Sequence, residues 1–265
     1  MTIAFTDGRI LDWEDAEAKK IFWHSSAHLM AEALESLYPG VKFWVGPALD
    51  NGFYYDVDLG DKQISEDDFK KIEDKMTELA RSKETFERKE VSKADALKYF
   101  TEKGDQYKCD LISRLDDGNI SFYTNGNFTD LCRGPHVKHA DDIKAIKLLS
   151  IAGAYWKGDQ NLQQLTRIYG ITFPKKTELD EYLALLEEAK KRDHNKLGRE
   201  LGLFMTEDVI GQGLPILMPK GAKILQILQR FVEDEEEKRG FMITKTPNMA
   251  KSDLYKISGH WDHYR

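Results

Sequence analysis

Apolar residues at helical spacing predict the first helices of the chain. Between about Asp15 and Tyr38, apolar positions recur every three or four residues, acidic residues stand near the expected N-terminus, and a Pro-Gly pair follows. The residues after Ser65 repeat this spacing, and Ser65 itself opens a helix-cap pattern. A shorter helix is expected from Ser92 to Lys103, where a glycine closes it. We therefore expect helices to form much of the first half of the chain.

Strands are predicted where β-branched and aromatic residues gather between turns. An Asn-Gly pair precedes the aromatic run Phe53 to Val57, which is a strong hairpin signal. Further strands are expected at residues 1–10, 85–91, 107–112, 120–124, 145–151 and 165–173. This alternation of strands and helices predicts an α+β fold, in which helices pack on an antiparallel sheet.

Pro174 marks the start of a second region, in which two longer helices are expected. From Thr177 to Arg199, apolar positions at helical spacing predict one long connecting helix with a basic end. An amphipathic helix is expected from about Lys220 to Arg239, with a strand at Phe241 to Lys245 after it. The loop at residues 211–215 lacks the spacing of a phosphate-binding loop, so we assign it no nucleotide role.

Composition limits the classes of function. With 265 residues, 41% of them hydrophobic, the chain is long enough for about two globular domains. Its formal net charge of -7 argues against a nucleic-acid coat protein or a polybasic membrane binder. The basic end of the connecting helix, at residues 190–196, is either a solvated face or a surface for RNA. No apolar run approaches the ~20 residues of a membrane span, no signal peptide is evident, and two cysteines make no disulfide framework, which together favour the cytoplasm.

Two pairs of residues carry the candidate chemistry. His24 and His28 stand four apart in the first predicted helix, so both imidazoles project from one face and can address one small molecule, water or metal ion. Cys132 and His136 are also four apart, but the Gly-Pro pair between them predicts a loop. By residue type the four complete a tetrahedral zinc set. The same imidazoles can instead shuttle protons without a metal, with an acid such as Asp130 orienting one of them.

Both pairs belong to motifs that resemble those of the threonyl-tRNA synthetase family. The motifs are His24-Ser25-Ser26-Ala27-His28-Leu29, Gly46-Pro47 and the segments at residues 50–56, 130–136, 153–159, 191–194 and 259–262. The resemblance covers nearly all 265 residues. It implies the end of a small N-terminal domain at 1–14, an editing domain at 15–174, a linker helix at 175–199, and the first part of a class II catalytic domain, with its motif 1, at 200–265.

The resemblance implies an editing hydrolase. Serine is threonine without one methyl, which is worth only about 1–3 kcal/mol of discrimination, so a synthetic site for threonine sometimes charges serine. The family's editing domain hydrolyses the ester of mischarged seryl-tRNA(Thr). The whole enzyme also joins threonine to tRNA(Thr) with ATP, but its ATP-binding motifs, and with them Mg and the catalytic zinc, are expected beyond Arg265. We therefore expect this chain to retain only the editing activity.

The resemblance also implies the residues of the editing site. The expected catalytic residues are His24, His28, Lys108, Cys132 and His136, and the expected substrate-binding residues are Tyr55, Tyr123 and Asp130. His24 would carry a proton or position the water, and Lys108 would hold a water or polarise the ester. Asp130 would hold the substrate's ammonium group. Unaided by the family, Lys108 is interpreted as a strand-edge lysine, and the two tyrosines as sheet core.

The resemblance implies partners and leaves alternatives for the metal. The expected partners are the acceptor end of tRNA(Thr) and a second copy of the chain, through motif 1, with no membrane. The family edits without a metal, so no cofactor is expected. In the related alanyl domains the set equivalent to His24, His28, Cys132 and His136 holds zinc. The alternatives are therefore a zinc-dependent alanyl-type deacylase and a non-catalytic module for tRNA binding and dimerisation.

Overall fold

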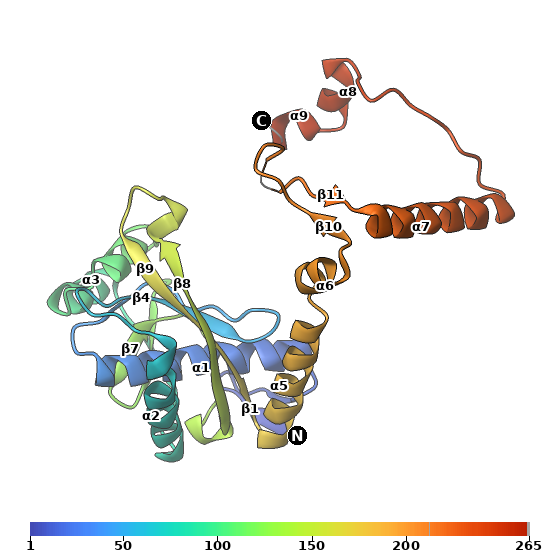
Figure 1. Ribbon diagram of the computed structural model, residues 1–265. Helices are drawn as coiled ribbons and strands as arrows, with labels where there is room; N and C mark the ends of the chain where they lie inside the picture. The colour runs from blue at the N-terminus through green and yellow to red at the C-terminus, as the bar shows by residue number, and fades with distance from the viewer. Residues whose placement is uncertain (212, 264–265) are drawn as a thin grey trace. The chain divides into compact units, whose positions relative to one another are not determined.

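The computed structural model describes residues 1–211 and 213–263 and divides the chain into two compact units, Met1–Leu186 and Glu187–Arg265 (Figure 1). Gln212, within the predicted loop at 211–215, lies outside the described residues, as do the last two residues of the predicted catalytic-domain segment, Tyr264 and Arg265.

Helix α1 (Ala16–Leu37) forms the centre of the first unit and confirms the first predicted helix. It begins at Asp15, whose carboxylate accepts the Glu17 N–H at 2.7 Å. The helix packs against α2 (Phe69–Arg81) and against the main sheet, where it lies across one face (Figure 1). Most of its middle is buried, including polar residues such as His28 and Glu32. The histidine pair therefore lies inside the unit and not on a solvated helix face.

The predicted antiparallel sheet is present as two larger sheets. The main one has the order β3 (Lys42–Phe43), β4 (Phe53–Asp58), β9 (Gln164–Phe173) and β8 (Ala145–Tyr155). The second has the order β5 (Glu87–Glu90), β6 (Ser121–Asn125) and β7 (Phe128–Leu131). All pairings are antiparallel, and the hairpin predicted around the Asn-Gly pair is confirmed by the pairing of β3 with β4. Mixed helices and antiparallel sheets agree with the α+β prediction.

The start of the chain is integrated into this unit. β1 (Thr2–Ala4) and β2 (Ile10–Asp12) form a small hairpin, and Ile3, Phe5 and Trp13 are buried in the main hydrophobic core. Three short 3-10 helices complete the unit: η1 (Glu66–Asp68), η2 (Ala140–Asp142) and η3 (Trp156–Gly158). The Ser65 capping box is formed at η1, directly before α2.

Helix α4 (Gln106–Ser113) replaces a predicted strand. Tyr107 and Ile112 favour a strand at residues 107–112, but the Asp105 carboxylate accepts the N–H groups of Tyr107 and Lys108, at 3.0 and 3.1 Å, and so caps a helix. The local cap outweighs strand propensity here. The preceding helix, α3 (Lys93–Glu102), is confirmed, with Ser92 as its cap.

Two predictions for the region after Pro174 are wrong. The single connecting helix is two helices, α5 (Lys176–Lys191) and α6 (His194–Leu201), because Asp193 caps a new helix by accepting the Lys196 N–H at 2.8 Å. The strand expected at Phe241–Lys245 is absent, since that segment pairs with no strand among the described residues. A strand needs a neighbour to satisfy its backbone, and propensity alone does not supply one.

The remaining elements of this unit are short apart from one helix. They are β10 (Phe204–Met205), paired with β11 (Ile216–Leu217), α7 (Pro219–Lys238), α8 (Ser252–Ile257) and α9 (His260–His263). The predicted amphipathic helix is confirmed as α7, and its apolar residues Ile224, Ile227, Leu228 and Phe231 are all exposed. Among the described helices, none combines the length and the apolar character that crossing a bilayer requires.

Candidate functional site

Six of the eight predicted site residues line one cavity of about 470 Å³ in the first unit. They are His24, His28, Tyr55, Lys108, Asp130 and Cys132. Helix α1 supplies the histidine pair, β4 the tyrosine, α4 the lysine, and β7 with the loop after it supplies the acid and the thiol. Segments far apart in the sequence thus meet at one site.

His24 and His136 both face the sulfur of Cys132. His24 Nε2 lies 3.0 Å from Sγ, and its Nδ1 lies 3.1 Å from the Gly46 carbonyl oxygen. Because a carbonyl only accepts, Nδ1 carries the proton and Nε2 presents a lone pair. His136 Nε2 lies 3.2 Å from the same sulfur. His28 is the other histidine of the pair in α1. Its ring nitrogen Nδ1 has no hydrogen-bond partner among the described residues.

Ser25 fixes the tautomer of His136 in the same way. The serine hydroxyl donates its proton to the Ile21 carbonyl at 2.8 Å, so at 3.2 Å it accepts the proton of His136 Nδ1. His136 Nε2 therefore also presents a lone pair to Cys132. A thiol has one proton and satisfies only one of the two imidazoles, which leaves a surplus of lone pairs at the sulfur.

This donor set fits a zinc ion. One ligand atom from each of His24, His28, Cys132 and His136 lies within 4.8 Å of the other three. Zinc bonds of about 2.0–2.3 Å in a tetrahedron bring ligand atoms into this range. The Gly46 carbonyl and the Ser25 hydroxyl hold the outer nitrogens of two imidazoles, as outer partners of metal-bound histidines do. The surplus of lone pairs is what a cation would satisfy.

Burial keeps this part of the site neutral. It lowers the pKa of His24, lowers the pKa of His28 to about 3, and holds that of His136 well below its usual value. It also raises the pKa of the Cys132 thiol to about 12. At neutral pH and without a metal, this part of the site consists of three neutral imidazoles and a thiol. A neutral imidazole with an exposed lone pair is a competent proton acceptor.

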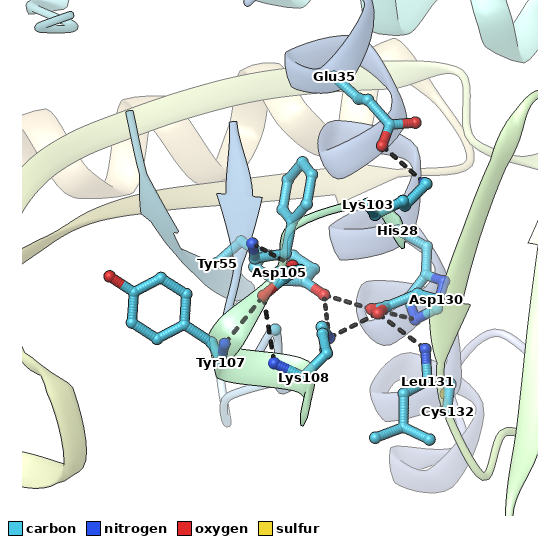
Figure 2. Close-up of polar contacts among 12 residues, drawn as sticks. His28, Glu35, Tyr55, Lys103, Asp105, Tyr107, Lys108, Asp130, Leu131 and Cys132 are labelled. Carbon is cyan, nitrogen blue, oxygen red and sulfur yellow. Dashed lines mark hydrogen bonds and ion pairs between the residues drawn. The ribbon is translucent and has the colours of Figure 1, made fainter. Parts of the chain in front are cut away.

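The other part of the site is ionic (Figure 2). Lys108 Nζ lies 2.5 Å from Asp130 Oδ1 and donates to the Tyr55 hydroxyl at 3.1 Å. Tyr55 in turn donates to Asp130 Oδ2, and the Leu131 N–H donates to Oδ1 at 2.8 Å. Lys108 and Asp130 are each 2% exposed, so neither charge is solvated. The lysine expected at a strand edge is instead a buried helical residue that neutralises a buried acid.

Lys108 sets the ionisation of Asp130. Burial alone would raise the pKa of this carboxyl, but the charge of Lys108, with support from His28 and the Tyr55 hydroxyl, lowers it below its ordinary value. Burial and the Asp130 charge raise the pKa of Tyr55. The site therefore holds an ionised carboxylate, an ammonium group and a neutral phenol in one connected cluster.

Asp105 is a site-supporting residue that the sequence interpretation missed. Its Oδ1 accepts the N–H groups at the start of α4, and its Oδ2 accepts the Phe43 N–H at 3.0 Å (Figure 2). It thus ties the helix that carries Lys108 to β3, which leads to Gly46. Its position directly after Gly104 is typical of a helix N-cap, but a strand was expected at residues 107–112. Ser25 and Gly46 were likewise absent from the predicted site.

Tyr123 and His136 lie behind the cavity and do not line it. The Tyr123 ring packs edge-on against His136, with 4.4 Å between ring centroids, and its hydroxyl lies 3.2 Å from Thr6 Oγ1. The same threonine hydroxyl accepts the His136 N–H at 3.0 Å. The expected pocket tyrosine therefore supports a histidine from behind.

Comparisons with known proteins show which sequences this chain resembles. The family model described as the threonyl and alanyl tRNA synthetase second additional domain matches residues 120–169. The chain is 56% identical over 256 residues to a threonine–tRNA ligase of Cytophaga hutchinsonii, covering 97% of the chain and 40% of that protein. It is 55% identical over 256 residues to that of Parabacteroides distasonis, covering 97% of the chain and 39% of the relative.

A third relative extends the match slightly. The threonine–tRNA ligase of Flavobacterium johnsoniae is 52% identical over 261 residues, covering 98% of the chain and 40% of that protein. The chain thus spans about 40% of the length of the curated relatives that it matches. Over 97–98% of its residues, the chain is therefore similar to threonine–tRNA ligases, and residues 120–169 match a domain model named for the threonyl and alanyl tRNA synthetases.

Proposed function

We propose that the first unit is an editing deacylase that hydrolyses the ester of seryl-tRNA(Thr). The observation that carries the proposal is the placement of His24 beside Lys108 and Asp130 in one cavity, with the Nε2 lone pair of His24 available. Ester hydrolysis needs a proton acceptor for water, a positive group for the developing oxyanion and a proton for the leaving ribose oxygen. The cavity contains groups suited to each task.

His24 is the proposed proton acceptor. Its Nδ1 proton is engaged by Gly46, so Nε2 takes the proton from the attacking water and can return it to the ribose oxygen. Lys108 supplies the positive charge that polarises the ester carbonyl and stabilises the oxyanion. The Cys132 thiol lies 3.0 Å from His24 Nε2 and 3.2 Å from His136 Nε2, and when its one proton goes to His136 the lone pair of His24 is free for water.

Asp130 is the proposed anchor for the substrate's ammonium group. Its Oδ1 already accepts two donors, Lys108 and the Leu131 N–H, whereas Oδ2 accepts a hydrogen bond from Tyr55 alone among the described residues. A carboxylate oxygen has two lone pairs, so Oδ2 retains one for an incoming ammonium group. Tyr55 then aligns both the acid and the lysine.

We propose that this reaction proceeds without a metal. The donor set of His24, His28, Cys132 and His136 also fits zinc, which would supply a water of lowered pKa when bound. Such an ion would occupy the Nε2 lone pairs of His24 and His136, and His24 would then no longer accept a proton. The zinc-dependent alternative is therefore distinguished by its metal requirement.

We further propose that residues 200–265 begin a class II catalytic domain. The exposed apolar residues of α7 support this proposal, because a motif 1 helix would bury them against a second copy of the chain. The domain boundaries given above and a cytoplasmic setting are part of the same proposal. The whole protein would ligate threonine to tRNA(Thr), using ATP and Mg in the remainder of its length.

Single-turnover hydrolysis tests the editing proposal. Seryl-tRNA(Thr) should lose serine, whereas threonyl-tRNA(Thr) should be largely spared. His24→Ala should slow release by about 10²–10⁴-fold, as expected for loss of a general base. His263→Ala, which removes an exposed histidine, is the matched control and should leave the rate unchanged. Equal rates for His24→Ala and the wild type, or no release above buffer, would refute the proposal.

A further inference from the structure

The cavity at the candidate site continues into two further hollows of the same unit. A side cavity of about 180 Å³ shares Leu111, Leu131, Cys132 and Arg133 with it. A polar groove of about 600 Å³ shares Leu115, Asn119, Ser121 and Arg133 with the side cavity. Arg133 lines all three hollows. Each hollow therefore adjoins the next on this side of the unit, and Arg133 lies where all three adjoin.

The groove brings arginines together on a chain that is acidic overall. Arg88, Arg114 and Arg133 line it, together with the acids Glu90 and Asp116. Arg88 pairs with Glu90 at 2.9 Å, and Arg114 pairs with Asp110 at 2.9 Å. The Arg133 guanidinium makes no ion pair or side-chain hydrogen bond within the part of the chain that the structure describes. Of the three, it is the one whose charge is not already compensated.

The position of Arg133 matches a defined place on the substrate. If the aminoacylated terminal adenosine occupies the 470 Å³ cavity, the preceding nucleotides must leave by its opening. The first group that they place there is the phosphate attached to that adenosine. A guanidinium is well suited to phosphate, because its planar set of donors can bind two oxygens at once. Beyond it, the leucines of the side cavity offer an apolar wall for an unstacked base.

We propose that the side cavity and the groove bind the single-stranded 3′ end of the RNA, with Arg133 paired to the phosphate next to the terminal adenosine. This inference rests on the proposed deacylase function and assigns a route to its substrate. Arg114 and Arg88 follow along the groove and meet phosphates farther from the ester. Their surface ion pairs are weak, so an entering phosphate can compete for them.

Two ester substrates distinguish an effect on RNA binding along this route from an effect on ester hydrolysis. The seryl ester of adenosine has no phosphate, whereas the seryl ester of the trinucleotide CCA has the phosphate that Arg133 would bind. Arg133→Ala should raise the half-saturating concentration of the trinucleotide ester by about tenfold or more relative to that of the adenosine ester. The salt dependence of trinucleotide use should also flatten, by a slope of about 0.7 for one lost phosphate contact.

A conservative variant and a matched control complete the experiment. Arg133→Lys keeps the charge but loses bidentate pairing and should give an intermediate effect. Arg81→Ala removes an exposed arginine of α2 that lines none of the three hollows, and should change neither substrate. Equal effects of Arg133→Ala on both substrates, or no effect on either, would overturn the route.

Direct binding keeps the two proposals distinguishable. If the wild type hydrolyses neither ester, the deacylase proposal fails, and the route is then tested with a fluorescent single-stranded RNA ending in CCA. Binding measured by anisotropy should weaken about tenfold in Arg133→Ala and remain unchanged in Arg81→Ala. Wild-type affinity retained in Arg133→Ala would overturn the route independently of any activity.

Discussion

The two parts of the candidate site respond to the same burial in opposite ways. Asp130 is buried with the ammonium of Lys108 at 2.5 Å, and the pKa of its carboxyl is lowered so that it stays charged. His28 is buried with its nearest carboxylate oxygen at 3.9 Å, and its pKa falls to about 3, so that it stays neutral. The distance to a compensating charge therefore decides which groups ionise.

A third buried group supports this reading. Glu32 lies in α1 and accepts hydrogen bonds from Asn125 and Asn127, but the charged group that acts on its carboxyl is another acid, Glu84. Burial, and then that acid, raise its pKa to about 7. Hydrogen bonds to neutral donors do not keep a buried carboxyl as acidic as one ammonium group does.

The largest expected effect is the loss of stability when Lys108 is removed from the ionic part of the site. Lys108→Met leaves Asp130 buried without a cation, which typically costs about 3–5 kcal/mol of folding free energy. Urea unfolding measures this loss. The double variant Lys108→Met/Asp130→Asn should recover part of it, because the uncompensated charge is gone. Lys147→Met removes a half-exposed pair with Glu73 and should cost less than about 1 kcal/mol. A similar loss in both single variants would contradict the comparison.

Acid should lower the folding stability that the neutral part of the site contributes, over a defined pH range. His28 has a folded pKa of about 3, below its ordinary 6.5, so the unfolded chain binds the proton first and stability falls as the pH drops below 6.5. The loss should reach about 3 kcal/mol near pH 4, at about 1.4 kcal/mol per pH unit. In chelator-treated protein, urea unfolding of His28→Gln should show a shallower slope. His194→Gln should keep the wild-type slope, and an unchanged slope in His28→Gln would contradict the assignment.

Zinc should distinguish the neutral part from the ionic one. At a hundredfold excess over its dissociation constant, zinc should stabilise the fold by about 2.7 kcal/mol and should inhibit hydrolysis, since it takes the lone pair of His24. Cys132→Ala should abolish the thermal shift, and Cys109→Ala, which removes the other cysteine, should keep it. Activity that disappears with chelator and returns with zinc would instead establish the metal-dependent alternative.

The smallest expected effect is that of Asp105, which connects the helix that carries Lys108 to the strand that leads to Gly46. Asp105→Asn keeps one acceptor oxygen for the start of α4 but loses the acceptor for Phe43, which should cost about 1–2 kcal/mol. The maximal rate should fall more than the substrate affinity, because Lys108 and Gly46 would shift relative to each other. Asp15→Asn, which changes the cap of α1, should be nearly silent in both stability and rate. A pure stability loss without a rate effect would show that Asp105 acts only on folding.

Local signals account for most of what the sequence predicted correctly. Helix α1, the hairpin of β3 with β4 and the capped helix α2 depend on periodicity, an Asn-Gly turn and a capping box, all of which act within a few residues. Helix α4 was missed because composition was weighed above the single cap residue Asp105. The break at Asp193 was missed for the same reason.

The site itself depended on information that periodicity does not carry. The spacing of His24 and His28 predicts a shared helix face, but nothing local brings Cys132 to that face, and that expectation came from the family resemblance. The pairing of Lys108 with Asp130 depends on how α4 packs against β7. Tyr123 was expected in the pocket, yet strand alternation alone does not tell which of two buried faces a side chain occupies.

The small hairpin at the start of the chain bears on how this unit can be shortened. Thr6 exchanges hydrogen bonds with His136, and the Lys138 backbone N–H donates to the Ala4 carbonyl at 2.8 Å. These first residues therefore support the loop that carries the Cys132 thiol and the His136 imidazole. A shortened version that begins at α1 would lose that support. Protein engineers seeking a compact, portable form of this unit should therefore shorten it from the other end.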